Sequence, residues 1–319
     1  MPSQSAGANM IDSVMNRVIR EIMENAAIFA PAERRHFIRR RARGREDARN
    51  LRQADYVFVS YGKSGRTWLR VMLSRFFQLR FGLPEDCLLS FDNLHGMNRA
   101  IPKILFTHDN YIRDYTGAGA CKTAFYNKAT VLLVRHPGDV AVSQYFQWRH
   151  RMLPYKKELN GYPPHGSEMS IFDFVMHREA GLQRVVQFMN EWARELPQVK
   201  SGLVVRYEDM RADCPSEFRR ILTWMGQQPT QVEVDRSVEF ASFDNLREME
   251  ARRAFKSAGK RMAPGDKSDP DSYKVRRAKV GGYRDYFDDR QVEQIETYIE
   301  DHLEPQFGYG VTRGQRAAS

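Results

Sequence analysis

The sequence lacks any run of about 18 consecutive apolar residues, which a helix needs to cross a membrane. Its N-terminus, MPSQSAGANM, also lacks the basic and apolar regions of a secretory signal peptide. From these two absences we expect a cytoplasmic protein that is neither exported nor embedded in a membrane.

Cysteine is scarce in this chain. The three cysteines, Cys87, Cys121 and Cys214, are odd in number, far apart and free of any C-x-x-C pair. This pattern argues against a disulfide framework and against a cysteine-rich zinc site. No internal repeat or clear linker divides the 319 residues, of which 42% are hydrophobic. Such a chain can bury a full core, so we expect a single domain.

Acidic residues are outnumbered, with 40 Asp and Glu against 50 Lys and Arg, for a formal net charge of +10. This excess implies an anionic partner, which is nucleic acid, an acidic membrane surface or a polyanionic small molecule. Nine of the arginines lie between Arg34 and Arg52. The simplest interpretation of that run is a solvated basic helix or arm.

Apolar residues recur at spacings of three and four over residues 11–23, which predicts an amphipathic helix. We expect this helix to pack on the protein's own domain. In the alternative, the helix and the arginines after it rest on an anionic membrane, which would place the protein peripherally at the inner membrane surface.

Four short apolar runs, rich in β-branched and aromatic residues, predict buried strands. They cover residues 55–60, 103–107, 130–134 and 202–206, and helical patterns lie between them, notably over 171–196 and 215–226. This alternation predicts an α/β fold with an open parallel sheet and helices on both faces. Ligands of such sheets bind beyond the carboxyl ends of the strands. Residues 252–282 are expected to form a long surface loop.

The segment Tyr61–Trp68, YGKSGRTW, lies between the first predicted strand and a helical pattern. A turn of this kind directs backbone N–H groups and the positive end of the helix dipole toward an anion. The usual nucleoside-triphosphatase loop requires a glycine where this chain has Val57. The segment therefore predicts a phosphate-binding turn that is not a Walker A loop.

This segment resembles the 5'-phosphosulfate-binding loop of the family of sulfotransferases that use 3'-phosphoadenosine-5'-phosphosulfate (PAPS). Residues 131–148, VLLVRHPGDVAVSQYFQW, resemble that family's 3'-phosphate-binding strand and helix. RYEDM, ASFDNL and VRRAKVGGYRDYF follow in the family's order, so the resemblance covers roughly residues 55–287. It implies a P-loop-like sulfotransferase domain over 53–305, preceded by a helix and basic arm over 1–52 and followed by a tail over 306–319.

The resemblance also implies roles for individual residues. Lys63 would stabilise the charge that develops on the oxygen bridging to the leaving phosphate, and His108 would be the catalytic base. The remaining donors to the 5' end would be Ser64, Gly65, Arg66 and Thr67, and Trp68 would stack on adenine. The other nucleotide-binding residues would be Arg135, Ser143, Arg276 and Arg277 at the 3'-phosphate, and Tyr207, Ser242 and Phe243 in the adenine pocket.

His136 is the second histidine considered as the base, although the family usually has a non-basic polar residue there. Other positions also depart from the family pattern. Gly62, Arg66, Phe106 and Ala278 stand where proline, threonine, lysine and glycine are usual, and Gly282 replaces an acidic residue.

The activity that the resemblance implies is a direct in-line transfer of the sulfuryl group from PAPS, releasing adenosine 3',5'-bisphosphate (PAP). The expected acceptor is a hydroxyl or amine of a small molecule, a carbohydrate or a lipid. We expect no metal, because the sequence shows no cluster of typical metal ligands.

Two other functions are alternatives for a chain with phosphate motifs and a positive charge. A P-loop kinase of nucleosides or small molecules would need a Walker A loop, which is missing. A non-enzymatic nucleic-acid-binding protein would use the arginine run, but this gives no reason for the ordered phosphate motifs. Nucleic acid is therefore not the expected partner.

Overall fold

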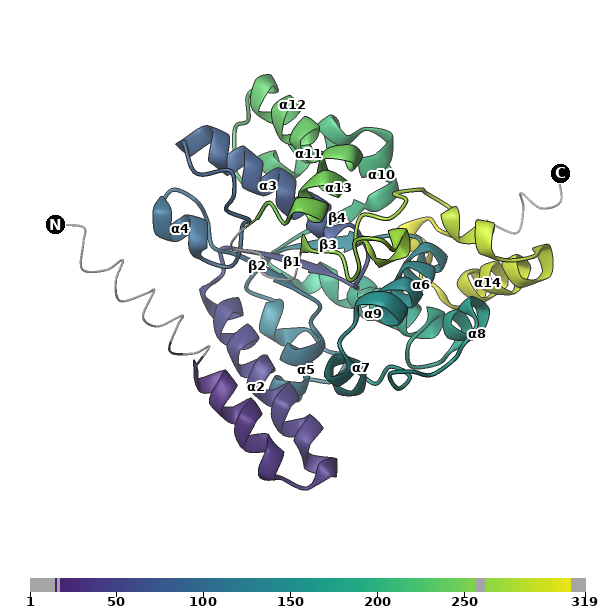
Figure 1. Ribbon diagram of the computed structural model, residues 1–319. Helices are drawn as coiled ribbons and strands as arrows, with labels where there is room; N and C mark the ends of the chain where they lie inside the picture. The colour runs from purple at the N-terminus through teal and green to yellow at the C-terminus, as the bar shows by residue number, and fades with distance from the viewer. Residues whose placement is uncertain (1–14, 16–17, 256–261, 311–319) are drawn as a thin grey trace. The chain divides into compact units, whose positions relative to one another are not determined.

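The computed structural model describes residues 15, 18–255 and 262–310. All four predicted strands are present: β1 (Tyr56–Ser60), β2 (Ile104–Thr107), β3 (Ala129–Val134) and β4 (Ser201–Arg206). They form one parallel sheet in the order β2-β1-β3-β4 (Figure 1). The central strands β1 and β3 are almost continuous buried apolar runs, as expected for strands that are covered on both faces. The predicted α/β fold class is confirmed.

Helices connect and flank these strands. The α-helices after the first described helical stretch (18–26) are α2 (Ala32–Gln53), α3 (Arg66–Phe81), α4 (Asn93–Met97), α5 (Asn110–Thr116), α6 (Pro137–Phe146), α7 (Pro154–Leu159), α8 (Ile171–Met176), α9 (Leu182–Glu195), α10 (Tyr207–Ala212), α11 (Cys214–Trp224), α12 (Gln231–Phe240), α13 (Phe243–Arg252) and α14 (Asp289–His302). Shorter helical turns include η1 (Ala27–Phe29), η3 (Gln147–Arg151, a π-helical turn), η6 (Pro270–Ser272), η7 (Gly282–Tyr286) and η8 (Pro305–Phe307).

The contacts of the chain divide it into two compact units. The first comprises Met1–Val59, Ser90–Val131 and Pro197–Gly202. The second comprises Ser60–Leu89, Leu132–Leu196 and Leu203–Ser319.

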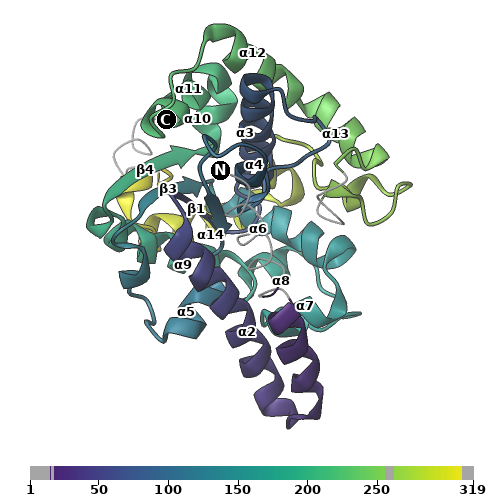
Figure 2. The ribbon, with the colours of Figure 1, turned by 90° about the vertical axis from the view of Figure 1, so that its left-hand side faces the viewer.

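In the first unit, residues 18–26 and α2 form an antiparallel pair, which we call the N-terminal hairpin (residues 18–53; Figures 1 and 2). Two ion pairs join its helices, Arg20 with Glu46 at 2.7 Å and Arg43 with Glu24 at 2.9 Å. The amphipathic helix expected over 11–23 is thus described from residue 18 onward, with Met15 also helical. Ile11 and Val14 lie outside the described residues.

α2 packs on α5 through a close backbone approach at Gly44. A Cβ atom at this position would lie 2.1 Å from the carbonyl oxygen of Tyr111. No side chain larger than hydrogen fits there, so Gly44 is what permits the contact between the two helices.

In the second unit, the helical pattern over 171–196 is interrupted. α8 ends at Met176 and α9 begins at Leu182. Gly181 lies in the break, where a Cβ would be 2.1 Å from the carbonyl oxygen of Val175. Close backbone contact therefore ends the first helix and makes a glycine necessary. Between α13 and η7, the predicted loop over 252–282 contains the short turn η6 among its described residues.

Candidate active site

The turn after β1 has an unusual backbone. Lys63 and Gly65 both adopt the left-handed region, with φ of 73° and 91°. A Cβ at Gly65 would lie 2.7 Å from the ring atom Cδ2 of Tyr207, so only glycine fits. Lys63 carries a Cβ in the same region, and a strained conformation of this kind persists where the surrounding structure enforces it.

Gly65 is also the N-cap of α3, a helix of 16 residues. The cap offers no side chain to the helix, and the first turn contains no acidic residue. The positive end of the α3 dipole is therefore not neutralised from within its own first turn, which favours an anion at this position.

Arg135 follows β3 and connects this turn to the C-terminal part of the chain. Its Nη1 donates to the carbonyl oxygen of Lys63 at 3.4 Å, and its Nη2 donates to that of Lys279 at 3.0 Å. The guanidinium lies 4.3 Å from the centre of the Tyr207 ring. The structure thus brings together Lys63, Arg135 and Tyr207, three of the residues that the sequence singled out.

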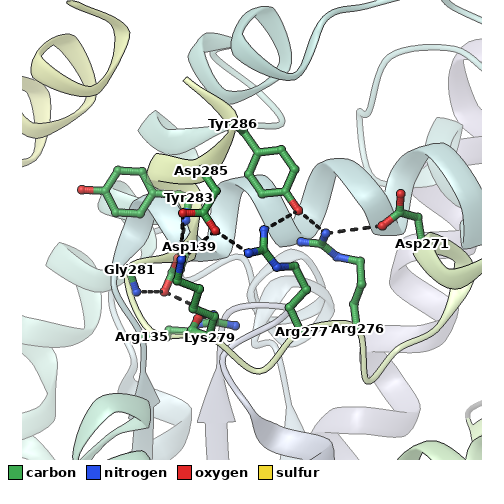
Figure 3. A network of polar contacts seen from close by, with 10 residues as sticks. All are labelled: Arg135, Asp139, Asp271, Arg276, Arg277, Lys279, Gly281, Tyr283, Asp285 and Tyr286. Carbon is green, nitrogen blue, oxygen red and sulfur yellow. Dashed lines mark hydrogen bonds and ion pairs between the residues drawn. The ribbon is translucent and has the colours of Figure 1, made fainter. Parts of the chain in front are cut away.

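Asp139, in the first turn of α6, holds the other side of this network (Figure 3). Its carboxylate accepts hydrogen bonds from the backbone N–H groups of Gly281 and Tyr283, both at 2.9 Å, and pairs with Arg135 at 3.2 Å. Asp139 was not identified from the sequence. An acidic residue shortly after Arg-His-Pro at a helix start is the signal that was available.

Arg276 and Arg277 lie at one end of the same network. Both donate to the hydroxyl of Tyr286, and Arg277 also pairs with Asp285 (Figure 3). The Arg276 guanidinium lies 3.7 Å from the ring centre of Phe146, on α6. The next residue after the pair, Ala278, has a φ of 52°, so the position where the family has glycine keeps a left-handed backbone without one.

Lys63 lies among several charges. Burial lowers its pKa to about 7, and the positive charges of Arg151, Arg135 and Arg276 contribute to the lowering, while Glu250 opposes them. Lys63 therefore titrates near neutral pH in the unliganded protein. Neither Arg151 nor Glu250 was identified from the sequence.

Two aromatic residues of the predicted adenine pocket, Trp68 and Tyr207, lie beside the turn. Trp68 meets Tyr207 edge to face, with ring centroids 5.8 Å apart, and Arg211 lies over Trp68 at 5.7 Å. Tyr207 is buried, which raises the pKa of its hydroxyl. Ser242 and Phe243 begin α13, where Ser242 is exposed and Phe243 is half-buried.

The remaining predicted residues fall on the same elements. Ser64 is buried in the turn, and Arg66 and Thr67 form the first turn of α3. Ser143 is half-buried on α6, two turns after the end of β3.

His136 is enclosed by aromatic rings. It stacks on Tyr283 with centroids 4.9 Å apart and meets Tyr309 edge to face at 5.6 Å. Its backbone N–H donates to Glu208 at 2.9 Å. Burial lowers the pKa of its ring to about 4, so His136 is neutral at physiological pH. These contacts favour a packing role over a catalytic one.

His108 belongs to the first unit, where it follows β2 and is half-buried. Its neighbour Asp109 has a φ of 62° and forms a buried ion pair with Lys122 at 2.9 Å. The backbone N–H of Asp109 donates to the Thr107 hydroxyl at 2.9 Å. The residues on both sides of His108 are therefore fixed by hydrogen bonds and charge.

The described part of the chain contains neither a candidate metal-binding cluster nor a candidate membrane-spanning helix. The described residues contain no group of three or more His, Cys, Asp or Glu side chains arranged to hold a metal ion. None of their helices is long and apolar enough to cross a membrane.

Comparison with known proteins gives consistent matches. The profile of the sulfotransferase domain family matches residues 121–306. Sulfotransferase 2A6 of Rattus norvegicus is 23% identical over 226 residues, which are 62% of this chain and 68% of that protein. Flavonol 4'-sulfotransferase of Flaveria chlorifolia is 23% identical over 279 residues, which are 79% and 80% of the two chains.

Two solved structures share the fold. The mouse sulfotransferase SULT7A1 complexed with PAP superposes with a TM-score of 0.53 at 19% identity, covering 78% of this chain and 84% of that one. Retinol dehydratase in a complex with retinol and PAP gives a TM-score of 0.51 at 20% identity, covering 82% and 86%.

Proposed function

The chain belongs to the family of PAPS-dependent sulfotransferases, and we propose that it transfers the sulfuryl group of PAPS to a hydroxyl or amine of a small-molecule acceptor. The observation that carries the proposal is the linkage between the two phosphate motifs. Arg135 touches the backbone of Lys63 and the Tyr207 ring, so one guanidinium joins the predicted 5' and 3' sites.

In the proposed complex the turn after β1 binds the 5'-phosphosulfate. Lys63, Ser64, Gly65, Arg66 and Thr67 supply cations, hydroxyls and backbone N–H groups there. The 3'-phosphate lies against Arg135 and Ser143, with Arg276 and Arg277 as further donors. The adenine packs near Trp68, Tyr207, Ser242 and Phe243. PAP in the two solved structures with this fold supports the assignment of the donor.

The proposed chemical step is an in-line displacement at sulfur. His108 takes the proton of the acceptor hydroxyl while the acceptor oxygen bonds to sulfur and the bond from sulfur to the bridging oxygen breaks. Lys63, protonated in the presence of the anionic donor, stabilises the charge on that oxygen as PAP leaves. Thr107 is the register partner of Val59, so β1 and β2 end at the same edge of the sheet. This supports placing His108 at that edge.

We propose further that no metal takes part, because arginine, lysine and backbone dipoles supply the positive charge at this site. The acceptor is a phenol, an alcohol, a carbohydrate or a lipid headgroup, recognised by loops such as 84–101, 109–125 and 149–170.

Calorimetric titration of the purified chain with PAP and with ATP tests the donor assignment. A 3'-phosphate held by arginine should make PAP bind about ten to a hundred times more tightly than ATP, because charged hydrogen bonds contribute about 1.5–3 kcal/mol each. Equal affinities, or tighter binding of ATP with magnesium, would favour the kinase. Transfer from radiolabelled PAPS to a panel of phenols, sugars and lipids then identifies the acceptor class.

A further inference from the structure

The N-terminal hairpin has apolar side chains on two faces. Ile19 and Met23 are half-buried and Ala27 is buried, so they lie on the packed side of the first helix. Val18 and Ile22 alternate with them at helical spacing but are 43% and 61% exposed. A helix that only covered its own domain would be polar on this second face.

The turn between the two helices continues this exposed surface. Ile28 is 53% exposed and Phe29 is 92% exposed, both in η1 at the end of the hairpin. Phe37, one turn into α2, is 58% exposed. Met15, Val18 and Ile22 on the first helix are exposed as well, and we call these three residues together with Ile28, Phe29 and Phe37 the apolar tip surface. Large side chains exposed together in this way mark an interaction site.

Arginines accompany the apolar tip surface. Residues 18–53 contain ten arginines against five acidic side chains. Several of the arginines are engaged within the unit, for example Arg20, Arg40 and Arg43 in ion pairs. Others are exposed on α2, namely Arg34, Arg35, Arg41 and Arg45. Of these, Arg35 also donates to the Ala30 carbonyl oxygen, and Arg41 lies over the Phe37 ring. An exposed apolar stripe beside exposed arginines is the pattern of a helix that lies in the interface of an anionic bilayer.

We propose that the hairpin docks the protein on an anionic lipid surface, with Ile28 and Phe29 inserted among the headgroups and the exposed arginines of α2 facing the lipid charge. A second copy of the chain fits this surface less well, because a two-fold contact would bring the same arginines together. Nucleic acid would pair with the arginines but would leave the apolar side chains in water. A lipid bilayer satisfies both features.

Sedimentation of the full chain with vesicles tests the proposal. We expect binding to vesicles of phosphatidylcholine with phosphatidylglycerol, weak binding to phosphatidylcholine alone, and release by salt. Ile28→Ser/Phe29→Ser should weaken binding about a hundredfold, because two apolar side chains leave the bilayer. The matched control is Val232→Ser, which removes another exposed apolar residue, from α12, and should change nothing.

A second pair of variants tests the charge. Arg34→Gln/Arg45→Gln should weaken vesicle binding about thirtyfold, whereas Arg178→Gln/Arg236→Gln, which removes two exposed arginines elsewhere, should have a much smaller effect. No sedimentation at low salt would overturn the proposal. So would light scattering that shows a dimer abolished by Ile28→Ser/Phe29→Ser, or DNA that binds the hairpin more tightly than the vesicles do.

A different observation, in the second unit, carries an inference that rests on the proposed function. Arg151 ends the π-helical turn η3, and its buried guanidinium pairs with Glu250 at 2.6 Å. It also donates to the carbonyl oxygens of Ser272 at 2.8 Å and Ala263 at 3.0 Å. π-helical turns occur frequently at functional sites.

Glu250 is fully buried and holds the same segment from the other side. Its carboxylate accepts hydrogen bonds from the backbone N–H groups of Lys274 and Val275, at 2.7 and 3.0 Å. The next residue is Arg276. The pair therefore fixes the backbone that presents Arg276, and both charges act on the Lys63 ammonium.

We infer that Arg151 and Glu250 form a positioning pair for the donor site, which holds the segment 263–276 in place and adds positive field at Lys63. A buried ion pair is a costly way to gain stability alone, because apolar residues of similar volume often stabilise a fold as well or better. Its position between η3, α13 and Arg276 gives it a use in ligand binding.

The test removes both charges together, since a single change would leave one charge buried and unpaired. Arg151→Met/Glu250→Gln should fold and should bind PAP about tenfold more weakly. The pH at which PAP affinity begins to fall should also move upward, because Arg151 affects Lys63 more strongly than Glu250 does. Arg151→Lys, with Glu250 kept, should bind PAP more tightly than the double variant does. The control Arg80→Met/Glu233→Gln removes another ion pair of this unit, at 2.8 Å.

Each result has a distinct meaning. A wild-type chain that does not bind PAP refutes the proposed function. If the wild type binds PAP and the variant loses only thermal stability, with unchanged affinity and pH dependence, the positioning role is refuted while the proposed function stands.

Discussion

The arginines of α2 and the arginines around Lys63 contribute to the same net charge but have different surroundings. On α2, Arg34, Arg35, Arg41 and Arg45 are exposed next to exposed apolar side chains. Near Lys63, Arg135, Arg151 and Arg276 have specific partners in carboxylates, carbonyl oxygens and aromatic rings.

The difference separates two kinds of anion recognition. Arginines held by fixed partners have lost their side-chain entropy before a ligand arrives, which suits a small ligand of defined shape. Exposed arginines keep more of that freedom, even where they touch a neighbour as Arg35 does at the Ala30 carbonyl oxygen, and they suit a surface of diffuse charge. Net charge alone left nucleic acid, membrane and small molecule open. The different surroundings of the two groups of arginines are the reason for proposing a small-molecule site near Lys63 and a membrane-binding surface at α2.

The largest expected effect separates chemistry from donor binding. His108→Ala should lower the transfer rate by about 10²–10⁴-fold, the usual contribution of a general base, while PAP affinity measured by calorimetry stays the same. His136→Phe is the control, because a phenyl ring can still stack on Tyr283. Loss of transfer in His136→Phe with full activity in His108→Ala would exchange the roles of the two histidines.

Replacing Arg135 should chiefly weaken PAP binding, whereas replacing His108 should chiefly slow transfer. Arg135→Ala removes the group that touches the Lys63 backbone, the Lys279 backbone and the Tyr207 ring. We expect PAP to bind about ten to a hundred times more weakly. Arg135→Lys should fall between, because an ammonium keeps the charge but not the planar fork. An unchanged PAP affinity in Arg135→Ala would remove this residue from the donor site.

The pH dependence of PAP binding should also distinguish the two regions. Lys63 has a pKa of about 7 in the free protein, and a bound phosphate raises that pKa. PAP affinity should therefore be constant below pH 7 and fall by up to about tenfold per pH unit above it, until the pKa of the complex is reached. Lys63→Met should bind more weakly and show no such fall. Vesicle binding by the hairpin should not change from about pH 7 to 9, because arginine does not titrate there.

Local sequence patterns predicted the parts of the molecule that local interactions determine. The four strands were found where β-branched runs predicted them, and the turn at Lys63 follows β1 as expected. Arg151 and Glu250 escaped prediction because their partners are far away in the sequence. Asp139 has one near partner, Arg135, but the backbone groups of Gly281 and Tyr283 that it also binds are far away. Glu250, for example, binds the backbone 24 residues later. The periodicity of 171–196 also could not reveal the close backbone contact that separates α8 from α9.

Gly65 should be much less tolerant than a glycine with the same kind of backbone elsewhere. Gly65→Ala adds a Cβ that would lie 2.7 Å from the Tyr207 ring, in addition to the strain of a φ of 91°. Gly82 has a φ of 63° and nothing within 4 Å of the position that a Cβ would take, so Gly82→Ala is a control for strain alone. We expect Gly82→Ala to cost about 1 kcal/mol of unfolding free energy and Gly65→Ala about 1–3 kcal/mol more, with loss of PAP binding. Equal costs for the two variants would mean that Tyr207 moves freely.

The smallest expected effect concerns Ala278, beside the paired arginines. Ala278 has a φ of 52°, in the left-handed region, and it stands where the family has glycine. Ala278→Gly relieves about 1 kcal/mol of strain in the folded state but increases the freedom of the unfolded chain by a similar amount. The unfolding midpoint in urea should therefore change little. The same variant tests whether Arg276 and Arg277 owe their positions to their partners Tyr286 and Asp285 or to the rigidity of this backbone. Unchanged PAP affinity would favour the partners, and a weaker affinity would show that the strained alanine itself helps to present the arginines.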